Sequence, residues 1–291
     1  MKRMNQNTVK PKMVFIDIDG TLVDDEGNIP LSAREACQQA RENGHLLYLC
    51  TGRSKAEVYD AIWEVGFDGL IGAGGGYVEF GEQVLYHKKV TVEAVRQMVD
   101  FFNEHDIDFF LESNSALYGS RNLQGHLERR IYGDIDNDPS ARAKKEQQPH
   151  PFIAGITYGE TDLYKHDVNK VCFLENPIVP FERIKQEFDG KFGVIQCTVP
   201  IFGEGSGELT ILGVHKASAI ADLIEHVGIS REDTIAIGDG MNDVEMLEFC
   251  HVGVAMGNAK PGLKAIADDV TETVLEDGLY HTFVKYGLIE G

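Results

Sequence analysis

Acidic residues follow two short apolar runs that lie more than two hundred residues apart in the chain. The first run, Val14-Phe15-Ile16, ends in Asp17-Ile18-Asp19-Gly20-Thr21, and the second ends in Gly238-Asp239-Gly240-Met241-Asn242-Asp243. Taken alone, each acidic segment is typical of a turn after a strand. In the second segment, Asn242 or Asp243 could also cap the next helix. If both runs are strands of one parallel sheet, the carboxylates meet at its carboxyl edge, where α/β proteins bind ligands.

Carboxylates gathered at one sheet edge repel one another. Two such charges at about 4 Å repel by roughly 4 kcal/mol at an effective dielectric of about 20. The arrangement therefore requires a cation or a raised pKa. Oxygen ligands at a site open to phosphate favour Mg²⁺ over zinc, so we predict a Mg²⁺ site here.

Two further segments could complete a phosphate site. Thr51 and Gly52, followed by Arg53, come directly after the apolar run Leu46-Leu47-Tyr48-Leu49-Cys50, and offer a hydroxyl and backbone N–H groups at the start of a helix. Lys216 could supply the positive charge that phosphoryl transfer requires. A lysine by itself is usually a solvated surface residue, so this expectation depends on the other motifs.

The segments around these residues alternate between strands and helices. Ser32 with Glu35 and Ser54 with Glu57 have the spacing of capping boxes that open helices, which Gly44 and Gly66 would end. The predicted strands lie at 14–16, 46–50, 70–71, 234–237 and 252–255, and the later helices lie at 217–227, at 243–249 and near Pro261. This alternation predicts an α/β fold with a doubly wound, Rossmann-like parallel sheet.

The middle of the chain has a different pattern. We expect helices at 92–103 and 181–188, and strands at 108–112, 170–174 and 193–200. A polar, proline-containing stretch with little periodicity lies at 134–150. This favours an α+β cap domain inserted into the core. The predicted domains are residues 1–84 and 210–291 for the core and residues 85–209 for the cap.

Composition excludes several classes of protein. The chain has 291 residues and a formal net charge of −20, with 47 acidic against 27 basic side chains, which argues against a nucleic-acid partner. We see neither an apolar run near the ~20 residues of a membrane span nor a secretory signal. Five scattered cysteines without CxxC pairing fit a cytoplasmic location. Oligomeric state is left open.

Two other patterns are rejected as sites. Asp134-x-Asp136-x-Asp138 resembles the start of an EF-hand loop, but Pro139 and Lys145 stand where glycine and glutamate are needed. The glycine-rich stretch from Gly72 to Gly76 resembles a dinucleotide fingerprint, but Tyr77 stands at its third glycine position.

The motifs together resemble the haloacid dehalogenase-like hydrolase superfamily, and the large insertion is similar to that of its Cof-type phosphatases. The resemblance rests on DIDGTL at 17–22, CTGR at 50–53, Lys216 after the insertion and GDGMNDVEM at 238–246. It departs from the subfamily at Gly74-Gly75-Gly76, where Asn-Gly-Ala is common, and at Ala217, where glycine is usual.

The resemblance implies a role for each matching residue. Asp17 would attack phosphorus and form an aspartyl-phosphate, with Asp19 as general acid and then general base. Mg²⁺ would be held by Asp17, the backbone carbonyl of Asp19 and Asp239, with Asp243 close by or acting through water. Thr51, Gly52, Lys216 and Asn242 would bind the phosphoryl group.

The implied activity is hydrolysis of small phosphate monoesters. Sugar phosphates are the first expectation, followed by phosphorylated cofactors such as flavin mononucleotide or pyridoxal phosphate. A phosphomutase using the same aspartyl-phosphate and a non-catalytic binding or regulatory protein remain alternatives. Polar residues in or near the cap that could contact substrate, or be plain surface, are Glu112, Asn114, Tyr118, Arg121 and Asn176.

Overall fold

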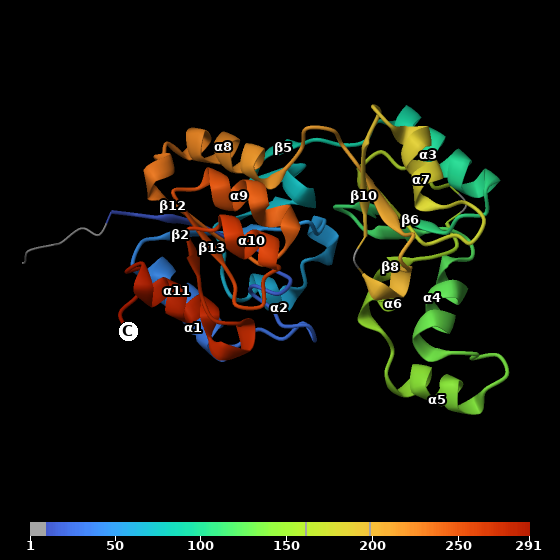
Figure 1. Cartoon of the computed structure of the whole chain (residues 1–291), viewed down its shortest axis with the longest axis horizontal. Coiled ribbons are helices and arrows are strands. Elements are labelled where there is room, and N and C mark those ends of the chain that lie inside the picture. Colours follow the sequence, from blue (N-terminus) through green and yellow to red (C-terminus); the bar gives the residue numbers. More distant parts are fainter. Residues whose placement is uncertain (1–9, 161, 198) are drawn as a thin grey trace, which may run out of the picture. The chain divides into compact units, whose positions relative to one another are not determined.

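The computed structural model describes residues 10–160, 162–197 and 199–291. Contacts divide the chain into two compact units (Figure 1). Of the described residues, the core unit comprises 10–53, 58–87 and 214–291, and the inserted unit comprises 54–57 and those within 88–213. The short segment 54–57 thus groups with the insertion although it follows a core strand.

The core unit is built on an eight-stranded sheet in the order β14-β13-β12-β1-β2-β3-β4-β5. The strands from β14 to β3 are parallel, and β4 and β5 are antiparallel additions. The strands are β1 Met13–Ile16, β2 Leu46–Cys50, β3 Gly69–Gly72, β4 Tyr77–Phe80, β5 Gln83–His87, β12 Thr234–Gly238, β13 Val252–Ala255 and β14 Asp269–Val270. Because β2 and β12 flank β1 on opposite sides, the sheet is doubly wound, as predicted.

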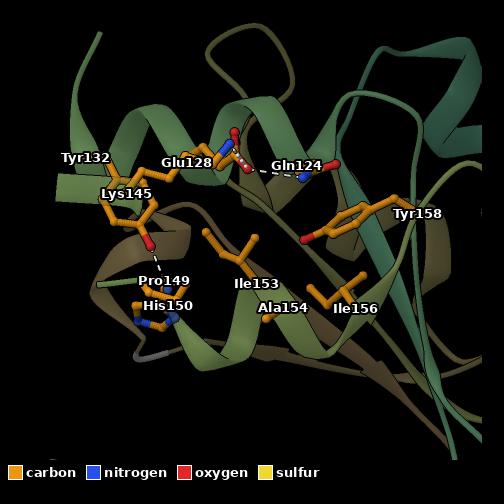
Figure 2. Close-up of a pocket in the computed structure, with 10 residues that line it drawn as sticks. All are labelled: Gln124, Glu128, Tyr132, Lys145, Pro149, His150, Ile153, Ala154, Ile156 and Tyr158. Carbon is orange, nitrogen blue, oxygen red and sulfur yellow. Dashed lines mark hydrogen bonds and ion pairs between the residues drawn. The ribbon is translucent and has the colours of Figure 1, made fainter. Parts of the chain in front are cut away.

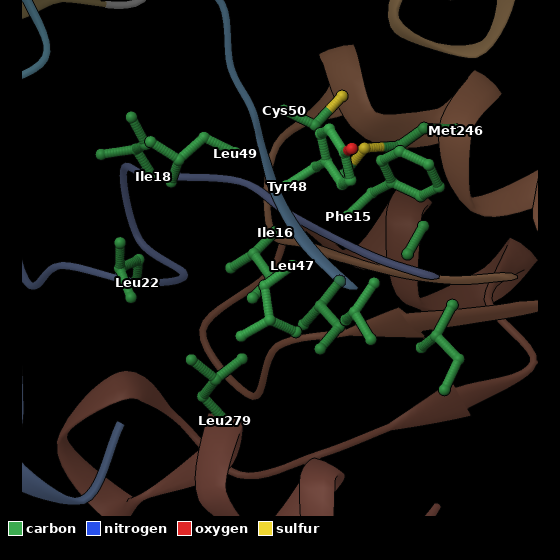
Figure 3. Packing of buried hydrophobic residues seen from close by; sticks show 14 of the residues in the cluster. Phe15, Ile16, Ile18, Leu22, Leu47, Tyr48, Leu49, Cys50, Met246 and Leu279 are labelled. Atoms are coloured by element: carbon green, nitrogen blue, oxygen red, sulfur yellow. The ribbon is translucent and has the colours of Figure 1, made fainter. Parts of the chain in front are cut away.

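Helices cover both faces of this sheet, with α8 and α9 together and α1 and α11 together (Figure 1). The core helices are α1 Leu31–Glu42, α2 Asp60–Trp63, α8 Lys216–Val227, α9 Val244–Phe249, α10 Pro261–Ile266 and α11 Gly278–Lys285. All four residues of β1 are fully buried, because a central parallel strand is covered on both faces. Figure 3 shows Phe15 and Ile16 of this strand among the side chains of β2 and the helices.

Neither predicted capping box opens a regular helix. Helix α1 begins at Leu31, so Ser32 lies inside its first turn and donates to the Asp277 carboxylate instead. The Ser54 N–H does donate to Glu57 Oε2 at 2.9 Å, but a single 3₁₀ turn, Lys55–Glu57, follows. The Ser54 hydroxyl bonds to side chains of the inserted unit rather than capping a helix.

The inserted unit has a six-stranded sheet in the order β10-β11-β9-β6-β7-β8. Its strands are β6 Phe109–Ser113, β7 Leu117–Gly119, β8 Ile156–Thr157, β9 Val168–Phe173, β10 Gly193–Gln196 and β11 Gly207–Thr210. Its helices are α3 Val92–Glu104, α4 Leu123–Tyr132, α5 Pro139–Gln147, α6 Pro151–Gly155 and α7 Phe181–Phe188. Mostly antiparallel pairing with separate helices gives the predicted α+β unit.

Alternation along β6 divides the interior of this unit into two clusters. Phe109 and Leu111 pack with α3 and α7, whereas Phe110 packs on the opposite face with α4 and α6. Successive side chains of a strand point to opposite faces, so each face of the sheet has its own cluster. Glu112 is two residues beyond Phe110 and therefore lies on the second face.

The polar stretch at 134–150, where the sequence shows little periodicity, contains helix α5. Asp138 caps the helix by accepting from the Ser140 N–H at 2.8 Å, and Pro139 takes the first helical position. Its single buried residue, Ala141, leaves too weak an apolar pattern to predict a helix. Across the described ranges, none of the helices has the length and apolar character needed to cross a membrane.

Candidate active site

The acidic motifs meet at the carboxyl edge of the core sheet. Asp17 directly follows β1, and its N–H donates to the Ile237 carbonyl of β12 at 3.0 Å, which aligns the ends of the two strands. Carboxylate oxygens of Asp17, Asp239 and Asp243 lie within 4.8 Å of one another. A protein brings three acidic groups this close where a cation can bind them.

Lys216 lies among these carboxylates. Its ammonium donates to Asp17 Oδ1 at 2.6 Å and to Asp243 Oδ1 at 2.5 Å, and the residue is only 2% exposed. Lys216 is the first residue of α8, whose N-terminus is capped by His215 through the Ser218 N–H. Helix α8 therefore begins just after the inserted segment, and its first residue lies at the sheet edge.

Both carboxylate oxygens of Asp243 accept hydrogen bonds from protein donors. Its Oδ1 accepts from Lys216, and its Oδ2 accepts from the N–H groups of Asp239 at 3.0 Å and Gly240 at 2.9 Å. Asp243 thus holds both the lysine and the loop that carries Asp239. For Asp17, the structure shows no donor to the second carboxylate oxygen among the described residues.

The close approach of these acidic groups and Lys216 shifts their pKa values. Burial raises the pKa of the Asp17 carboxyl, and Lys216 opposes that rise. Burial and the charge of Asp243 raise the pKa of Asp239 to about 6. Burial lowers the pKa of Lys216, but Asp17 and Asp243 raise it by more, so the lysine stays protonated. One cation beside three acidic groups leaves an excess of negative charge that can attract Mg²⁺.

Gly20 allows Asp239 to approach the first motif. It has a φ of +75°, and a Cβ atom there would lie 2.4 Å from Asp239 Oδ2. Both the backbone conformation and the space therefore require glycine.

Gly20→Ala is expected to displace Asp239 and to weaken Mg²⁺ binding by about tenfold or more, because a carboxylate ligand must move. The matched control is Gly27→Ala, since Gly27 has a φ of +83° but nothing within 4 Å of its Cβ position. Titration calorimetry with Mg²⁺ measures both variants. Equal Mg²⁺ affinities would show that the close contact does not position Asp239.

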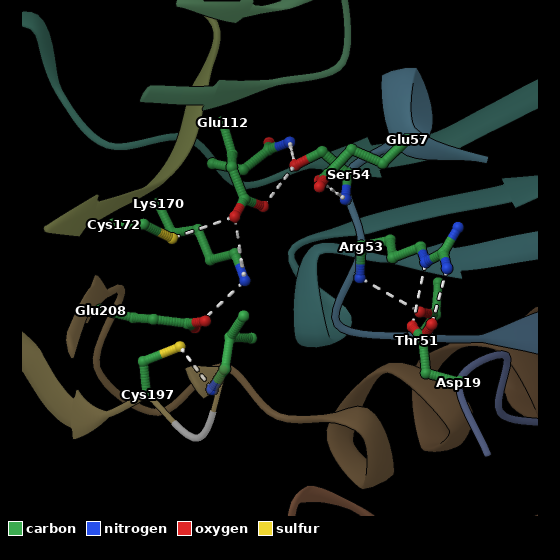
Figure 4. Close-up of polar contacts among 12 residues, drawn as sticks. Asp19, Thr51, Arg53, Ser54, Glu57, Glu112, Lys170, Cys172, Cys197 and Glu208 are labelled. Atoms are coloured by element: carbon green, nitrogen blue, oxygen red, sulfur yellow. Dashed lines mark hydrogen bonds and ion pairs between the residues drawn. The ribbon is translucent and has the colours of Figure 1, made fainter. Parts of the chain in front are cut away.

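Asp19 is oriented by Arg53, a residue to which sequence analysis assigned no specific role. The Arg53 guanidinium donates from Nε at 2.9 Å and from Nη2 at 2.6 Å to the two carboxylate oxygens (Figure 4). Such a two-point contact fixes the plane of a carboxylate. The Asp19 side chain is 63% exposed, so it remains accessible for proton exchange.

The predicted phosphate-binding residues lie at the same edge. Thr51 is buried, and its hydroxyl accepts from the Arg53 N–H at 3.1 Å. Asn242 is exposed, and its Nδ2 lies 3.9 Å from the position of a Cβ at Gly52. The expected helix N-terminus does not lie at this segment, because a 3₁₀ turn, Lys55–Glu57, follows it and the short helix α2 begins only at Asp60.

Asn258 is a site residue that sequence analysis missed. Its side-chain amide donates to the Gly20 carbonyl at 2.7 Å and accepts from the Val274 N–H at 3.2 Å. It lies shortly after β13, at the same carboxyl edge as the acidic motifs, and that position was the available signal. The sequence also did not predict a role for Gly75. A Cβ atom at this position would lie 2.5 Å from the carbonyl oxygen of His215, the residue before Lys216, so only glycine fits there.

Glu112 of the inserted unit is buried rather than a surface residue. It ion-pairs with Lys170 at 3.3 Å, accepts from Cys172, and is bonded to the Ser54 hydroxyl (Figure 4). Burial, followed by the charge of Glu57, raises the pKa of its carboxyl. Asn176 is structural, because its carboxamide oxygen accepts from two backbone N–H groups of its own turn.

Known proteins are similar in sequence to this chain over almost its whole length. The model of the haloacid dehalogenase-like hydrolases matches residues 14–283. The candidate phosphatase YkrA of Bacillus subtilis is 30% identical over 96% of this chain and 99% of its own. Pyridoxal phosphate phosphatase YbhA of Escherichia coli is 25% identical over 91% of this chain and 96% of its own.

A solved structure agrees with this similarity. The sugar phosphatase BT4131, of subclass IIB in the same superfamily, superimposes with a TM-score of 0.71 and is 28% identical. The comparison covers 96% of this chain and 100% of that one.

The chain therefore belongs to the haloacid dehalogenase-like hydrolases, and the resemblance seen in its motifs is confirmed. It is an enzyme, and its placement among the phosphoric monoester hydrolases agrees with the family and with these relatives.

Proposed function

We propose that this protein is a Mg²⁺-dependent phosphatase that hydrolyses small phosphate monoesters through an aspartyl-phosphate on Asp17. The observation that carries the proposal is the ammonium of Lys216, held between Asp17 and Asp243 beside Asp239. Phosphoryl transfer depends mainly on positioning and on neutralising the negative charge spread over the phosphoryl oxygens. The placement of Lys216 among these carboxylates supports both the positioning of the phosphoryl group and the neutralisation of its charge.

In the first step, an oxygen of Asp17 attacks phosphorus and forms an acyl phosphate while the bond from phosphorus to the ester oxygen breaks. Asp19 gives its proton to that leaving oxygen, which departs as an alcohol. Thr51, Gly52, Lys216 and Asn242 bind the transferring phosphoryl group. Arg53 fixes the orientation of the Asp19 carboxylate through its two hydrogen bonds.

In the second step, a water molecule attacks the phosphorus of the acyl phosphate. Asp19, now deprotonated, takes a proton from that water, and the bond between phosphorus and the Asp17 oxygen breaks. Inorganic phosphate leaves and the carboxylate of Asp17 is restored. One residue thus serves as acid and then as base.

The residues of the site fit Mg²⁺ because their donors are oxygens and carry excess negative charge. Asp17, the backbone carbonyl of Asp19 and Asp239 would hold the ion. Asp243, whose oxygens already accept three hydrogen bonds, would act through water. When bound, Mg²⁺ supplies positive charge that neutralises the phosphoryl oxygens.

Mg²⁺ affinity is expected to rise with pH. Protons compete with the ion for Asp239, whose pKa is raised to about 6, and for Asp17, whose pKa is also raised. At pH values below the pKa of such a carboxyl, Mg²⁺ affinity should rise about tenfold per pH unit for each proton that the ion displaces. Calorimetric titration from about pH 5 to about pH 7 measures the trend, and Asp239→Asn should reduce its slope. A constant affinity over this range would contradict the coupling.

The substrate is proposed to be a sugar phosphate or a phosphorylated cofactor. One relative is named as a pyridoxal phosphate phosphatase and a structural neighbour as a sugar phosphatase, which supports both classes. Cytoplasmic action is part of the proposal, since all five cysteines are free thiols.

The test is release of inorganic phosphate from an aryl phosphate and from a panel of sugar phosphates and phosphorylated cofactors. Activity should require Mg²⁺ and disappear in chelator. Isomerised sugar phosphate with little free phosphate would identify a phosphomutase instead. Activity that persists in chelator would contradict Mg²⁺ dependence.

A further inference from the structure

A cavity of about 270 Å³ lies within the inserted unit, beside helix α4 (Figure 2). Residues of α4, α5 and α6 line it together with Tyr158, which follows β8. The cavity lies wholly in the inserted unit and shares no residue with the candidate active site.

A buried carboxylate is the main charged group of this cavity. Glu128 is 5% exposed, and its Oε1 accepts from Gln124 at 3.1 Å and ion-pairs with Lys145 at 2.8 Å. Its Oε2 has no hydrogen bond to the described residues. The Lys145 side chain is 38% exposed and belongs to α5, so it can turn to solvent without disturbing a core.

Two further polar atoms of the cavity are buried without a partner in the described part of the chain, the Tyr158 hydroxyl and His150 Nδ1. Figure 2 shows the Tyr158 hydroxyl pointing into the space between α4 and the side chains of Ile153 and Ile156. Burial, with the charge of Glu128, raises the pKa of Tyr158 to about 12, so this hydroxyl stays neutral. Buried polar atoms without partners are uncommon, and a ligand or water must satisfy them.

We propose that this cavity is a second binding site, for a small molecule with a primary ammonium group on a short aliphatic chain. An ammonium donates through its N–H groups, and the cavity offers it the carboxylate of Glu128 and the unpartnered hydroxyl of Tyr158. Ile153 and Ile156 provide the apolar surface for the chain. The volume is just below the range usual for ligand pockets and suits a molecule of few heavy atoms.

An anion or a neutral alcohol fits this cavity less well. An anion would face the buried charge of Glu128, and an alcohol would leave that charge without a new partner. Lys145 already neutralises Glu128, so an amine must displace it. The proposal therefore predicts opposite effects for changes at these two residues.

Calorimetric titration of the full chain with n-butylamine and with 1,4-diaminobutane tests the proposal, with 1-butanol and butyrate as comparison compounds. We expect saturable binding of the amines at one site. Glu128→Gln should weaken this binding by about tenfold or more, because it removes a charge-assisted hydrogen bond. The matched control is Glu146→Gln, an exposed residue of α5 that should leave the affinity unchanged.

Lys145→Met should strengthen amine binding by several-fold, since the competing cation is gone, and Tyr158→Phe should weaken it. These two variants keep Glu128 and so decide the question even if Glu128→Gln does not fold. Absence of saturable amine binding, which a cavity filled only by water would give, overturns the proposal. Equal affinity for 1-butanol, or weaker binding in Lys145→Met, also overturns it.

Discussion

Asp17→Asn is expected to lower kcat by about 10⁴-fold or more, the scale seen when a covalent nucleophile is removed. A carboxamide has the same shape but cannot form the acyl phosphate. Phosphate release from an aryl phosphate under saturating Mg²⁺ measures the loss. The control is Asp25→Asn, an exposed acidic residue shortly after the first motif, which should keep its activity.

The same substitution should not destabilise the metal-free fold. Asp17 lies in a site where acidic groups outnumber the single buried cation, Lys216. Removing one negative charge relieves repulsion and leaves the ion pair between Lys216 and Asp243. In chelator, the thermal midpoint of Asp17→Asn should equal or exceed that of the wild type. More than a tenth of wild-type activity in this variant would refute the nucleophile assignment.

Lys216→Met is expected to abolish activity and to destabilise the metal-free protein by about 3–5 kcal/mol. Methionine matches the length of the chain but leaves the buried carboxylates of Asp17 and Asp243 without their cation. Breaking a buried ion pair on one side has an effect of this size. Urea unfolding in chelator measures the change in the free energy of unfolding.

Added Mg²⁺ should restore part of the stability of Lys216→Met, because the ion neutralises the same carboxylates, but it should not restore activity. Lys260→Met is the control, since Lys260 is an exposed lysine beside Asp239. That variant should change stability by about 0.5 kcal/mol or less. If both lysine variants were equally stable, the buried ion pairs would not support the fold.

The two predictions separate chemistry from packing at one site. Asp17→Asn removes a reacting group without removing support, whereas Lys216→Met removes both. Measuring activity and unfolding for the pair therefore tests the roles assigned to Asp17 and Lys216.

Sequence by itself was sufficient for the fold class and for the residues gathered at the sheet edge. The short buried strands that end before Asp17 and Asp239 could be predicted from the sequence. The periodicity of apolar residues and the glycine turns that mark such strands depend only on residues close together in the chain. Parallel strands place their carboxyl ends at one edge, so convergence of residues distant in the chain followed from topology alone.

Tertiary structure alone decided which partner each polar group takes. Asp243 holds Lys216 and the loop of Asp239, Arg53 orients Asp19, and Ser54 bonds to the inserted unit instead of opening a helix. The choice among possible hydrogen-bond partners depends on which side chains packing brings within about 3 Å, and spacing along the chain does not contain that information. Helix α5 and the cavity at Glu128 were unpredicted for the same reason, since a weakly apolar segment takes its structure from what it packs against.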